Sequence, residues 1–567
     1  MQYLYVIAAA TIISLVLVPF MMSHAERLGM VDHPSGRRVH EEPIPRVGGW
    51  GIVFGTLIPL FAMTTVTPLL GIFIYGSLVL LLFGALDDRY EMGPKAKFIG
   101  QFLAAIPLVV FGDFFITQYP ILAEWAPPTA VSMGITIVCL VAMINATNQS
   151  DGLDGLAGGE SLLTLAGIAL LAYLADASVL LIVAMAAIGG VLGFLRYNTH
   201  PARVFMGDSG AQFLGFVVGF LVIWLTQYAD TDLSPAAMLP LLGLPVFDFF
   251  LVLYVRLRNK QPIFKASKHH IHHRLLDRGF VHKETVTIIY VLHAAMVLSG
   301  LLLRNAHDLV ILAAYAGICG VFLMLLTSAE RKSWHARDTG WQFGQLIDMS
   351  GDIDKTLRKT LLVVFPRRVL EFLIPIYLVA VSLLIDNVDR DYGLVALFLL
   401  VPVTLQSLMR RSLGATPRRL AVYTVTVFVV YLCAWDRSGW QRDWAPVFEM
   451  GYYVAVALAV AIAIRFSPRR RKEEFRVTSL DYLLLFVVLC SIFFADFLPI
   501  GRFSVPIFIV ALVVMLYGIE LLMVERKQRS DWLGKASGLA LMIIAWRGLD
   551  LVRLDVYLMP VLDRLLS

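Results

Sequence analysis

The chain has few cysteines and few charged residues, and both shortages exclude classes of protein. Its 567 residues include four cysteines, and charged residues make up 16% of the sequence. Cys139, Cys319, Cys433 and Cys490 show no CxxC spacing and have no histidine beside them, which argues against a disulfide framework or a cysteine–zinc site. The net charge of +5 comes from basic residues clustered in short loops between apolar runs, so it does not indicate nucleic-acid binding.

Long apolar runs dominate the sequence instead, and hydrophobic residues make up 58% of it. Runs of about 20 residues are long enough to cross a hydrocarbon core of roughly 30 Å. Because a bilayer offers no water to unpaired backbone groups, such runs must be helices. They also lack the alternating pattern of an outer-membrane barrel strand. We therefore predict an all-α, multi-pass membrane protein with no nucleic-acid partner.

The spacing of the runs predicts about eleven spans in residues 1–330, a cytoplasmic linker at 331–366, and an additional membrane module at 367–567 with six or seven spans. The first run has no basic segment before it and no small-x-small site after it, so we expect a span that starts outside rather than a cleaved signal peptide. The predicted spans are 2–22, 47–66, 69–86, 97–117, 130–147, 160–176, 178–195, 209–227, 236–256, 285–303, 309–327, 369–386, 391–408, 419–435, 449–465, 479–498, 503–524 and 535–545, with a surface-lying tail at 546–567.

Acidic and amide residues stand at the ends of several apolar runs, where a membrane protein tolerates them poorly. The groups are Asp87-Asp88, Asn148 with Asp151 and Asp154, and Asp208. Basic residues concentrate in the loops that carry these groups, so the positive-inside rule places them all on the cytoplasmic side. Ionisable residues at such positions indicate a functional site. We predict one cation-binding site assembled from distant parts of the chain.

Each acidic motif also has a simpler structural explanation. Asp87 and Asp88 suit Mg²⁺ binding or base catalysis, but such a pair can also cap a helix beside Arg89. Asp208 stands where a loop enters a helix, so it can hold a metal or cap that helix. The segment 145–159 carries two asparagines and two aspartates among glycines, which is too dense for a plain turn.

The basic and aromatic candidates have alternatives as well. Arg37, Arg38 and Arg46 can bind phosphate at a membrane surface or simply set the topology. Phe205 can stack on a nucleobase or anchor the chain at the interface. The histidines of the segment 269–273 lie among lysines and arginines, which favours a phosphate or sugar-phosphate ligand over zinc. Together these loops fit Mg²⁺-assisted phosphoryl transfer from a soluble diphosphate to a lipid acceptor.

Five ordered motifs give residues 1 to about 330 a specific resemblance to the polyprenyl-phosphate N-acetylhexosamine-1-phosphate transferase family. They are LGMVDHPSGRRVH with PIPRVGG, GALDDR, NATNQSDGLDGLAGG, VFMGDSG and HHIHHRL. The resemblance implies an eleven-helix enzyme of the bacterial cytoplasmic membrane, with its active site facing the cytoplasm. It would transfer a sugar-1-phosphate from a UDP-sugar to undecaprenyl phosphate and release UMP. Residues 331–567 resemble no family that we can name.

The resemblance also implies a role for each matching residue. Asp208 and Asn148 would hold Mg²⁺, with Mn²⁺ as a substitute, and Asp87 would deprotonate or position the lipid phosphate with Asp88 beside it. The nucleotide and sugar would be bound by Asp151, Asp154, Phe205, Arg46, His270, His272 and His273. The lipid phosphate would be bound by Arg37, Arg38 and Lys97.

The histidine motif resembles that of the GlcNAc-1-phosphate branch, which initiates O-antigen, teichoic acid and similar cell-wall and surface glycans. That branch often has an Asp-Arg pair before HIHH, whereas this chain has Ser267, Lys268 and His269. Another UDP-N-acetylhexosamine or UDP-MurNAc-pentapeptide therefore stays open as the donor. A transporter or flippase is the alternative from another class. A homodimer or glycan-assembly partners also stay open.

Overall fold

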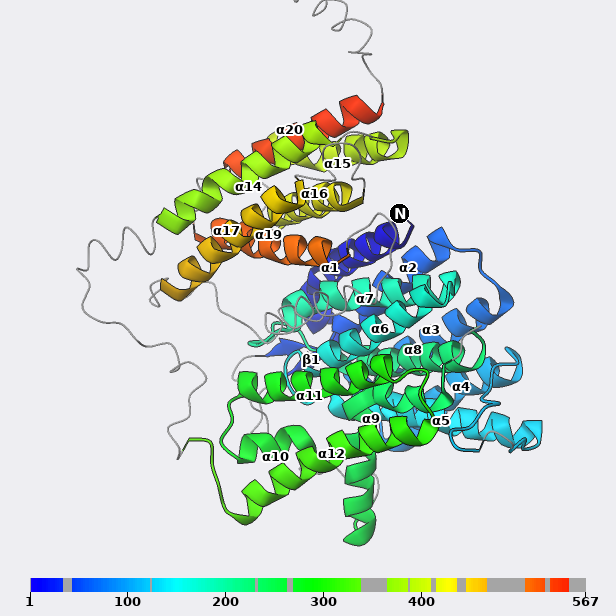
Figure 1. Ribbon diagram of the computed structural model, residues 1–567. Helices are drawn as coiled ribbons and strands as arrows, with labels where there is room; N and C mark the ends of the chain where they lie inside the picture. The colour runs from blue at the N-terminus through cyan, green and yellow to red at the C-terminus, as the bar shows by residue number, and fades with distance from the viewer. Residues whose placement is uncertain are drawn as a thin grey trace, which may run out of the picture. The chain divides into compact units, whose positions relative to one another are not determined.

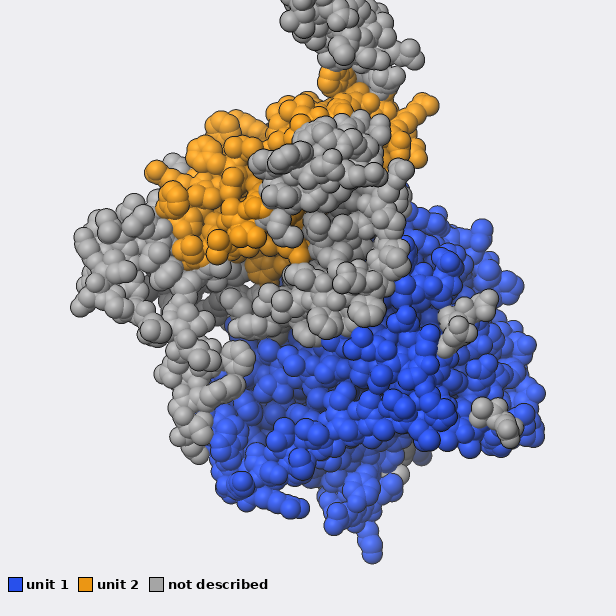
Figure 2. Space-filling view, in the orientation of Figure 1, with its two compact units in different colours: residues 1–347, 478–483 blue, residues 348–477, 484–567 orange. Residues whose placement is uncertain are grey.

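The computed structural model describes eleven stretches of the chain, which form two compact units (Figure 2). The first unit holds the described residues up to Arg337, and the second holds those from Phe365 onward. The described residues are 2–33, 43–122, 125–229, 233–262, 269–337, 365–385, 388–408, 415–435, 445–466, 505–525 and 531–549. Nearly all of them are helical, which confirms the prediction of an all-α protein.

The first unit is a bundle of long helices, seen in Figure 1 from blue to green. Two short strands, β1 (Val31–Asp32) and β2 (Ile44–Pro45), pair antiparallel beside it. The helices are α1 (Gln2–Leu28), α2 (Gly48–Met63), α3 (Pro68–Tyr90), α4 (Pro94–Val110), α5 (Thr129–Ser150), α6 (Leu156–Leu174), α7 (Ser178–Asn198), α8 (Gly207–Gln227), α9 (Met238–Arg258), the short α10 (Ile271–Asp277), α11 (His282–Leu302) and α12 (Asp308–Arg331).

Each of the eleven predicted spans of the first unit corresponds to one helix. Among the described residues, nine helices are long and apolar enough to cross a membrane. The other two, α2 and α4, have 16 and 17 residues, fewer than the roughly 20 that a full crossing needs. Several helices run past the predicted spans, because the backbone hydrogen bonds continue beyond the apolar run. Asp87, Asp88 and Asn148 therefore lie in the last turns of helices rather than in loops, and Asp208 lies in a first turn.

Helix α8 is the centre of this unit. In its apolar stretch 94% of the residues are buried, and it packs against α2, α3, α5, α6, α7 and α9. A helix that is apolar on all sides has to be surrounded by others. Its sequence begins Gly207-Asp208, so the central helix presents a carboxylate at its first turn. The fold thus fixes Asp208 on the most enclosed element of the bundle.

Glycines let α8 approach its neighbours at this end. A Cβ added to Gly84 of α3 would lie 2.3 Å from the Cα of Ser209, and one added to Gly49 of α2 would lie 2.3 Å from the Gly210 nitrogen. Both distances are far below any real Cβ contact, and both involve backbone atoms that cannot swing away. The helices meet here because these positions have no side chain.

Gly84→Ala is therefore expected to destabilise the protein, by about 1–3 kcal/mol, which is the usual cost of forcing an extra carbon into a packed interior. Thermal unfolding of the purified protein in detergent measures this. Gly71→Ala is the matched control on the same helix, because the nearest atom to its new Cβ lies 3.9 Å away. An unfolding midpoint of Gly84→Ala equal to that of the control would contradict the close packing of α3 on α8.

Helix α9 is broken at Gly243, whose φ of 57° and ψ of −133° are not helical. Unpaired backbone groups are costly at membrane depth, so the break needs substitute partners. The Leu244 N–H donates to His293 Nδ1 over 3.1 Å, and Tyr315 donates to the Gly243 carbonyl over 3.0 Å. Since His293 Nδ1 accepts, its proton lies on Nε2, which donates to Thr164 over 2.9 Å. The break is thus built into the fold.

The second unit contains six described helices, drawn in Figure 1 from yellow-green to red. Among its packed pairs are α14 with α20, α15 with α20, and α16 and α17 with α19. The predicted span at 479–498 and the part of the tail after Leu549 lie outside the described residues. The six helices are α14 (Phe365–Leu384), α15 (Arg390–Leu408), α16 (Ala415–Trp435), α17 (Ala445–Phe466), α19 (Val505–Glu525) and α20 (Asp531–Gly548).

Candidate active site

Four helices of the first unit bring predicted site residues together. The residues that meet are Asp87 at the end of α3, Lys97 in the first turn of α4, Asn148 at the end of α5 and Asp208 at the start of α8. We call these four residues the four-helix cluster. The Lys97 ammonium lies 2.8 Å from Asp87 Oδ2 and also donates to Asp208 Oδ2. Asn148 donates its amide to Asp208 Oδ1 over 3.0 Å. Residues as many as 121 positions apart in sequence thus share one site.

The four-helix cluster has the chemistry of a site for a divalent cation. Two carboxylates converge on one point, where the Lys97 ammonium supplies positive charge. Asp87 Oδ1 is buried and has no hydrogen-bond partner, which is costly for a carboxylate oxygen unless a cation uses it. Carboxylate and amide oxygens are the ligands that Mg²⁺ takes. Asp208, Asn148 and Asp87 therefore fit the predicted magnesium ion.

Asp88 points to a different partner from Asp87. Its carboxylate accepts the backbone N–H of Asp208 over 2.8 Å and that of Ser209 over 3.2 Å. Helix α8 has no cap of its own, because Met206 stands at its N-cap position. Asp88 thus caps α8 from a neighbouring helix and sets the position of Asp208. Gly207 leaves room for it, since a Cβ there would lie 2.5 Å from Asp88 Oδ2.

A buried amide layer lies beneath the cluster. Asn145 donates to Gln101 Oε1 over 2.7 Å, and Gln101 Nε2 lies 3.4 Å from Gln212 Oε1. These side chains come from α5, α4 and α8, so they fix the three helices against each other. Each lies one helical turn deeper than a member of the cluster, namely Asn148, Lys97 and Asp208. The layer explains how the cluster keeps its spacing.

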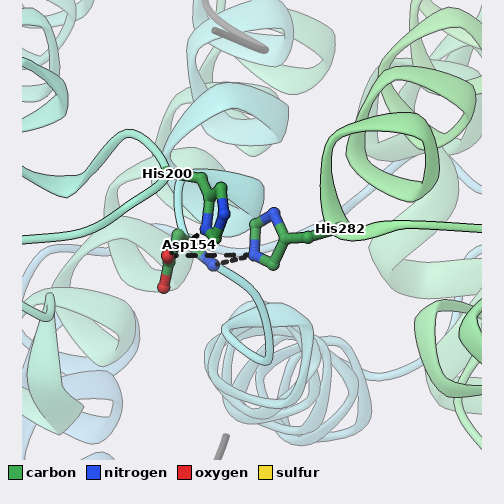
Figure 3. A group of neighbouring side chains, drawn as sticks. All are labelled: Asp154, His200 and His282. Carbon is green, nitrogen blue, oxygen red and sulfur yellow. Dashed lines mark hydrogen bonds and ion pairs between the residues drawn. The ribbon is translucent and has the colours of Figure 1, made fainter. Parts of the chain in front are cut away.

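The loop after α5 is anchored through Asp154 (Figure 3). Asp154 Oδ2 accepts from His200 Nδ1 over 2.7 Å and from the Ala202 N–H over 3.0 Å, while the Asp154 N–H donates to His282 Nε2 over 3.0 Å. The two imidazole rings are stacked with centroids 4.0 Å apart. Burial acts to raise the pKa of Asp154, but the hydrogen bonds from His200 and Ala202 outweigh it and lower the pKa.

Asp154, His200 and His282 are residue types that bind transition metals, and their ligand atoms lie within 4.8 Å of one another. Each of these atoms already has a hydrogen-bond partner inside the group, and stacked rings do not aim their lone pairs at one point. We therefore interpret the group as the anchor of the loop. His200 and His282 were not predicted from the sequence, because each is a single histidine in a loop or at a helix start, far from Asp154 along the chain.

Asp151 lies in the same loop, next to the four-helix cluster. Burial, with the nearby carboxylates of Asp208 and Asp154, raises the pKa of Asp151 to about 7. Such a carboxyl is poised to change its charge when a cation or a cationic group arrives. The resemblance implies a place for Asp151 in the nucleotide site, and the effect of the Asp208 charge on its pKa shows that the two carboxyl groups are close.

The segment that carries the histidine motif packs against this loop. Asp248 of α9 accepts from His270 Nδ1 over 2.7 Å and from the Ile271 N–H over 2.9 Å, which fixes the start of α10 and the orientation of the His270 ring. His272 packs on Gly152, where a Cβ would lie 2.4 Å from its Nε2. Burial and the neighbouring histidines lower the pKa of His272 to about 3, so this ring is neutral at physiological pH. The His273 ring lies 4.3 Å from that of His272.

Gly152→Ala is expected to displace the His272 ring and to lower kcat/KM for the soluble substrate about 10- to 100-fold, because small misplacements in a site have large kinetic effects. Steady-state kinetics measure this. Gly93→Ala is the control, since no atom lies within 4 Å of its added Cβ. Unchanged kinetics in Gly152→Ala would show that the contact between the loop and the histidine motif has no part in the reaction.

The remaining predicted residues lie in two places. Arg46 Nη2 is 2.6 Å from Asp32 Oδ1, next to the β1–β2 pair. The adjoining chain is bonded to the loop before α8, because the Phe205 N–H donates to the Pro45 carbonyl and the Gly48 N–H donates to the Phe205 carbonyl. Arg46 and Phe205 therefore belong to neighbouring segments next to the N-terminal end of α8. Arg37 and Arg38 lie outside the described residues.

Comparison with known proteins identifies relatives for the first half of the chain. The family model described as "Glycosyl transferase family 4" matches residues 70–226, which include most of α3 and α8, all the helices between them and the four-helix cluster. A relative from Bacillus subtilis (strain 168), the "Probable undecaprenyl-phosphate N-acetylglucosaminyl 1-phosphate transferase", is 35% identical over 297 residues. The match covers 52% of this chain and 82% of that protein.

Two further relatives carry similar names. The "Undecaprenyl-phosphate alpha-N-acetylglucosaminyl 1-phosphate transferase" of Escherichia coli (strain K12) is 29% identical over 294 residues, covering 51% of this chain and 80% of that protein. The "Decaprenyl-phosphate N-acetylglucosaminephosphotransferase" of Mycobacterium tuberculosis (strain ATCC 25618 / H37Rv) is 32% identical over 297 residues, covering 47% and 74%. These matches leave about half of this chain without a counterpart.

Proposed function

The chain belongs to the polyprenyl-phosphate N-acetylglucosaminyl 1-phosphate transferases of glycosyl transferase family 4, and on that basis we propose that it transfers GlcNAc-1-phosphate from UDP-GlcNAc to undecaprenyl phosphate and releases UMP. One observation of the structure supports this most: the four-helix cluster gathers two carboxylates, an amide and an ammonium at one end of the bundle. This set suits the joining of two anionic phosphates.

We propose direct displacement as the reaction. A phosphate oxygen of the lipid attacks the β-phosphorus of the UDP-sugar, a new phosphorus–oxygen bond forms, and the bond from that phosphorus to UMP breaks. Asp87 accepts a proton from the lipid phosphate or orients it, and Lys97 turns its ammonium from the carboxylates toward the incoming phosphate. Mg²⁺, held by Asp208, Asn148 and Asp87, would neutralise the diphosphate. Asp88 keeps Asp208 in place by capping α8.

The soluble donor would lie between the Asp151 loop and the histidine motif. Its uracil ring would stack on Phe205, and its diphosphate and sugar would meet the basic and histidine side chains. Asp154 would shape the donor site by holding this loop in place through the contacts of its Oδ2 with His200 and Ala202. The donor-site residues are Asp151, Asp154, Phe205, Arg46, His270, His272 and His273, and the lipid phosphate also meets Arg37 and Arg38.

The enzyme would act in a bacterial cytoplasmic membrane with this site facing the cytoplasm, where UDP-sugars are made. The predicted spans and the basic loops support that orientation. The product would be the first lipid-linked sugar of a surface glycan. A transporter is disfavoured, because Asp87, Asp88 and Asp208 lie at helix ends that meet on one side of the first unit rather than at mid-membrane.

A panel assay tests the proposal. The purified protein in vesicles receives undecaprenyl phosphate, Mg²⁺ and one UDP-sugar at a time. The donors are UDP-GlcNAc, other UDP-N-acetylhexosamines and UDP-MurNAc-pentapeptide. The lipid product is identified by mass spectrometry. We expect a GlcNAc-diphospholipid and UMP in equal amounts. No UMP from any donor would refute the transferase assignment. Exchange of labelled UMP into UDP-GlcNAc without lipid would refute direct displacement in favour of a covalent phospho-sugar intermediate on an aspartate.

A further inference from the structure

A groove in the second unit has the shape and polarity of a site for one lipid. It has a volume of about 1060 Å³ and lies between α14, the end of α19 and the start of α20. All of its lining residues belong to the second unit, so it is separate from the four-helix cluster. The relatives described above match only about half of this chain.

The groove changes from charged to apolar along α14. Arg367, Arg368 and Glu371 line it in the first two turns of that helix. From Phe372 to Leu383 every lining residue of α14 is apolar. The stretch from Arg367 to Leu383 is roughly 24 Å long at the rise of an α-helix, which approaches the thickness of a hydrocarbon core. A ligand of matching shape has an anionic head and a long hydrocarbon tail.

The charged end of the groove, which we call the rim, indicates the charge of the ligand's head. Arg367, Arg368 and Lys535 of α20 line this end of the groove together with one acid, Glu371, so these four lining residues carry a net formal charge of +2 (three positive minus one negative). A phosphate monoester carries about −1.5 to −2 near pH 7, whereas a phosphodiester carries one charge. Arginine also binds phosphate through paired donors. The rim therefore suits a monoester better than the headgroup of an ordinary phospholipid.

The position of the rim agrees with a membrane surface. Trp532 of α20 is 74% exposed, and Lys535 Nζ lies 5.8 Å from the centre of its ring. Exposed tryptophan is typical of the interface between headgroups and acyl chains. Phe372, which is 66% exposed, and Ile376, which is 57% exposed, line the open groove one and two helical turns beyond Arg368. The head would thus lie at headgroup level and the tail along α14.

We propose that this groove binds a second molecule of polyprenyl phosphate, the lipid that combines a phosphate monoester with one long hydrocarbon chain. The choice of this lipid rests on the function proposed above; the charge and shape of the groove do not. A second site on the same chain would keep acceptor lipid next to a membrane enzyme that uses it once per turnover.

Counting bound lipid tests the proposal on the full-length protein. Native mass spectrometry of the purified chain, titrated with undecaprenyl phosphate, is expected to show two lipids per chain. The double variant Arg368→Gln/Lys535→Gln, which removes two of the three positive charges and leaves polar side chains in their place, is expected to bind one. The double variant Arg331→Gln/Lys332→Gln is the matched control, because both residues are exposed at the end of α12 in the first unit, and it is expected to bind two.

The outcomes separate the groove from the active site. One lipid per wild-type chain would refute the groove site and leave the proposed function standing, whereas no lipid at all would refute both. Two lipids in the groove variant would place the second molecule elsewhere. Equal displacement of the second lipid by phosphatidylglycerol would show a general site for anionic lipids, contrary to the proposal.

A variant in the apolar part tests the tail separately. Ala380→Phe, which adds a ring to the groove wall, is expected to weaken the second undecaprenyl phosphate at least tenfold. It should leave the binding of a short-chain phosphate, farnesyl phosphate, unchanged. Unchanged binding of the long lipid would contradict the placement of its tail along α14.

Discussion

Asp208→Asn is expected to lower transferase turnover at least 1000-fold while the protein stays folded. The substitution preserves the shape of the side chain but removes the charge at the first turn of α8. Asp208 is where Lys97 and Asn148 both converge, so no neighbour can replace it. A 1000-fold loss corresponds to about 4 kcal/mol of transition-state stabilisation, which is the scale of several charge contacts at a transferring phosphate.

The measurement is UMP release from UDP-GlcNAc in vesicles, at increasing Mg²⁺ concentrations. We expect no recovery at high Mg²⁺, because the ligand itself is lost. Glu26→Gln is the matched control, since it removes one carboxylate from an exposed position at the end of α1. Full Mg²⁺-dependent activity in Asp208→Asn would remove the metal assignment and with it the proposed mechanism.

The common location of the acidic residues could be predicted from the sequence, because each stands at the end of an apolar run and the charge of the loops predicts the same side for all of them. The central position of α8 follows the same logic, since a run that is apolar on all faces must be enclosed. The sequence could not show which of Asp87 and Asp88 faces the four-helix cluster and which caps α8. Adjacent residues on a helix point about 100° apart, so one of them faces the cluster and the other faces α8. Which one does so depends on how α3 packs.

The sequence also could not reveal the partners that hold the site together. The resemblance implies that Lys97 binds the lipid phosphate, and the structure adds that its ammonium bridges Asp87 and Asp208. Hydrogen-bonded pairs such as Asp154 with His200 join separate loops, and no spacing rule connects them. The amides of Gln101, Asn145 and Gln212 likewise come from three different helices and are hydrogen-bonded to one another. The sequence pattern of a single helix does not show such partners.

Asp88→Asn is expected to lower the stability of the protein by about 3 kcal/mol, and Asp87→Asn is not. The Asp88 carboxylate accepts two backbone N–H groups of α8, and a hydrogen bond to a charged group contributes about 1.5–3 kcal/mol. An asparagine can accept one of them but turns its own N–H₂ toward the other. Asp87 Oδ1 is buried without a partner, and the Lys97 ammonium that pairs with Asp87 Oδ2 also pairs with Asp208, so we expect the replacement of Asp87 by asparagine to cost the fold little.

Two readouts on the same two variants separate these roles. Asp87→Asn should keep the wild-type unfolding midpoint in detergent and lose activity at least 100-fold, as expected for a residue that touches the reacting phosphate. Asp88→Asn should unfold at a clearly lower temperature. Well below its own midpoint it should retain turnover but require more Mg²⁺, because a loosened α8 misplaces Asp208. If Asp88→Asn were as stable as the wild type and inactive at every Mg²⁺ concentration, then Asp88 would act on the substrate and the capping assignment would be wrong.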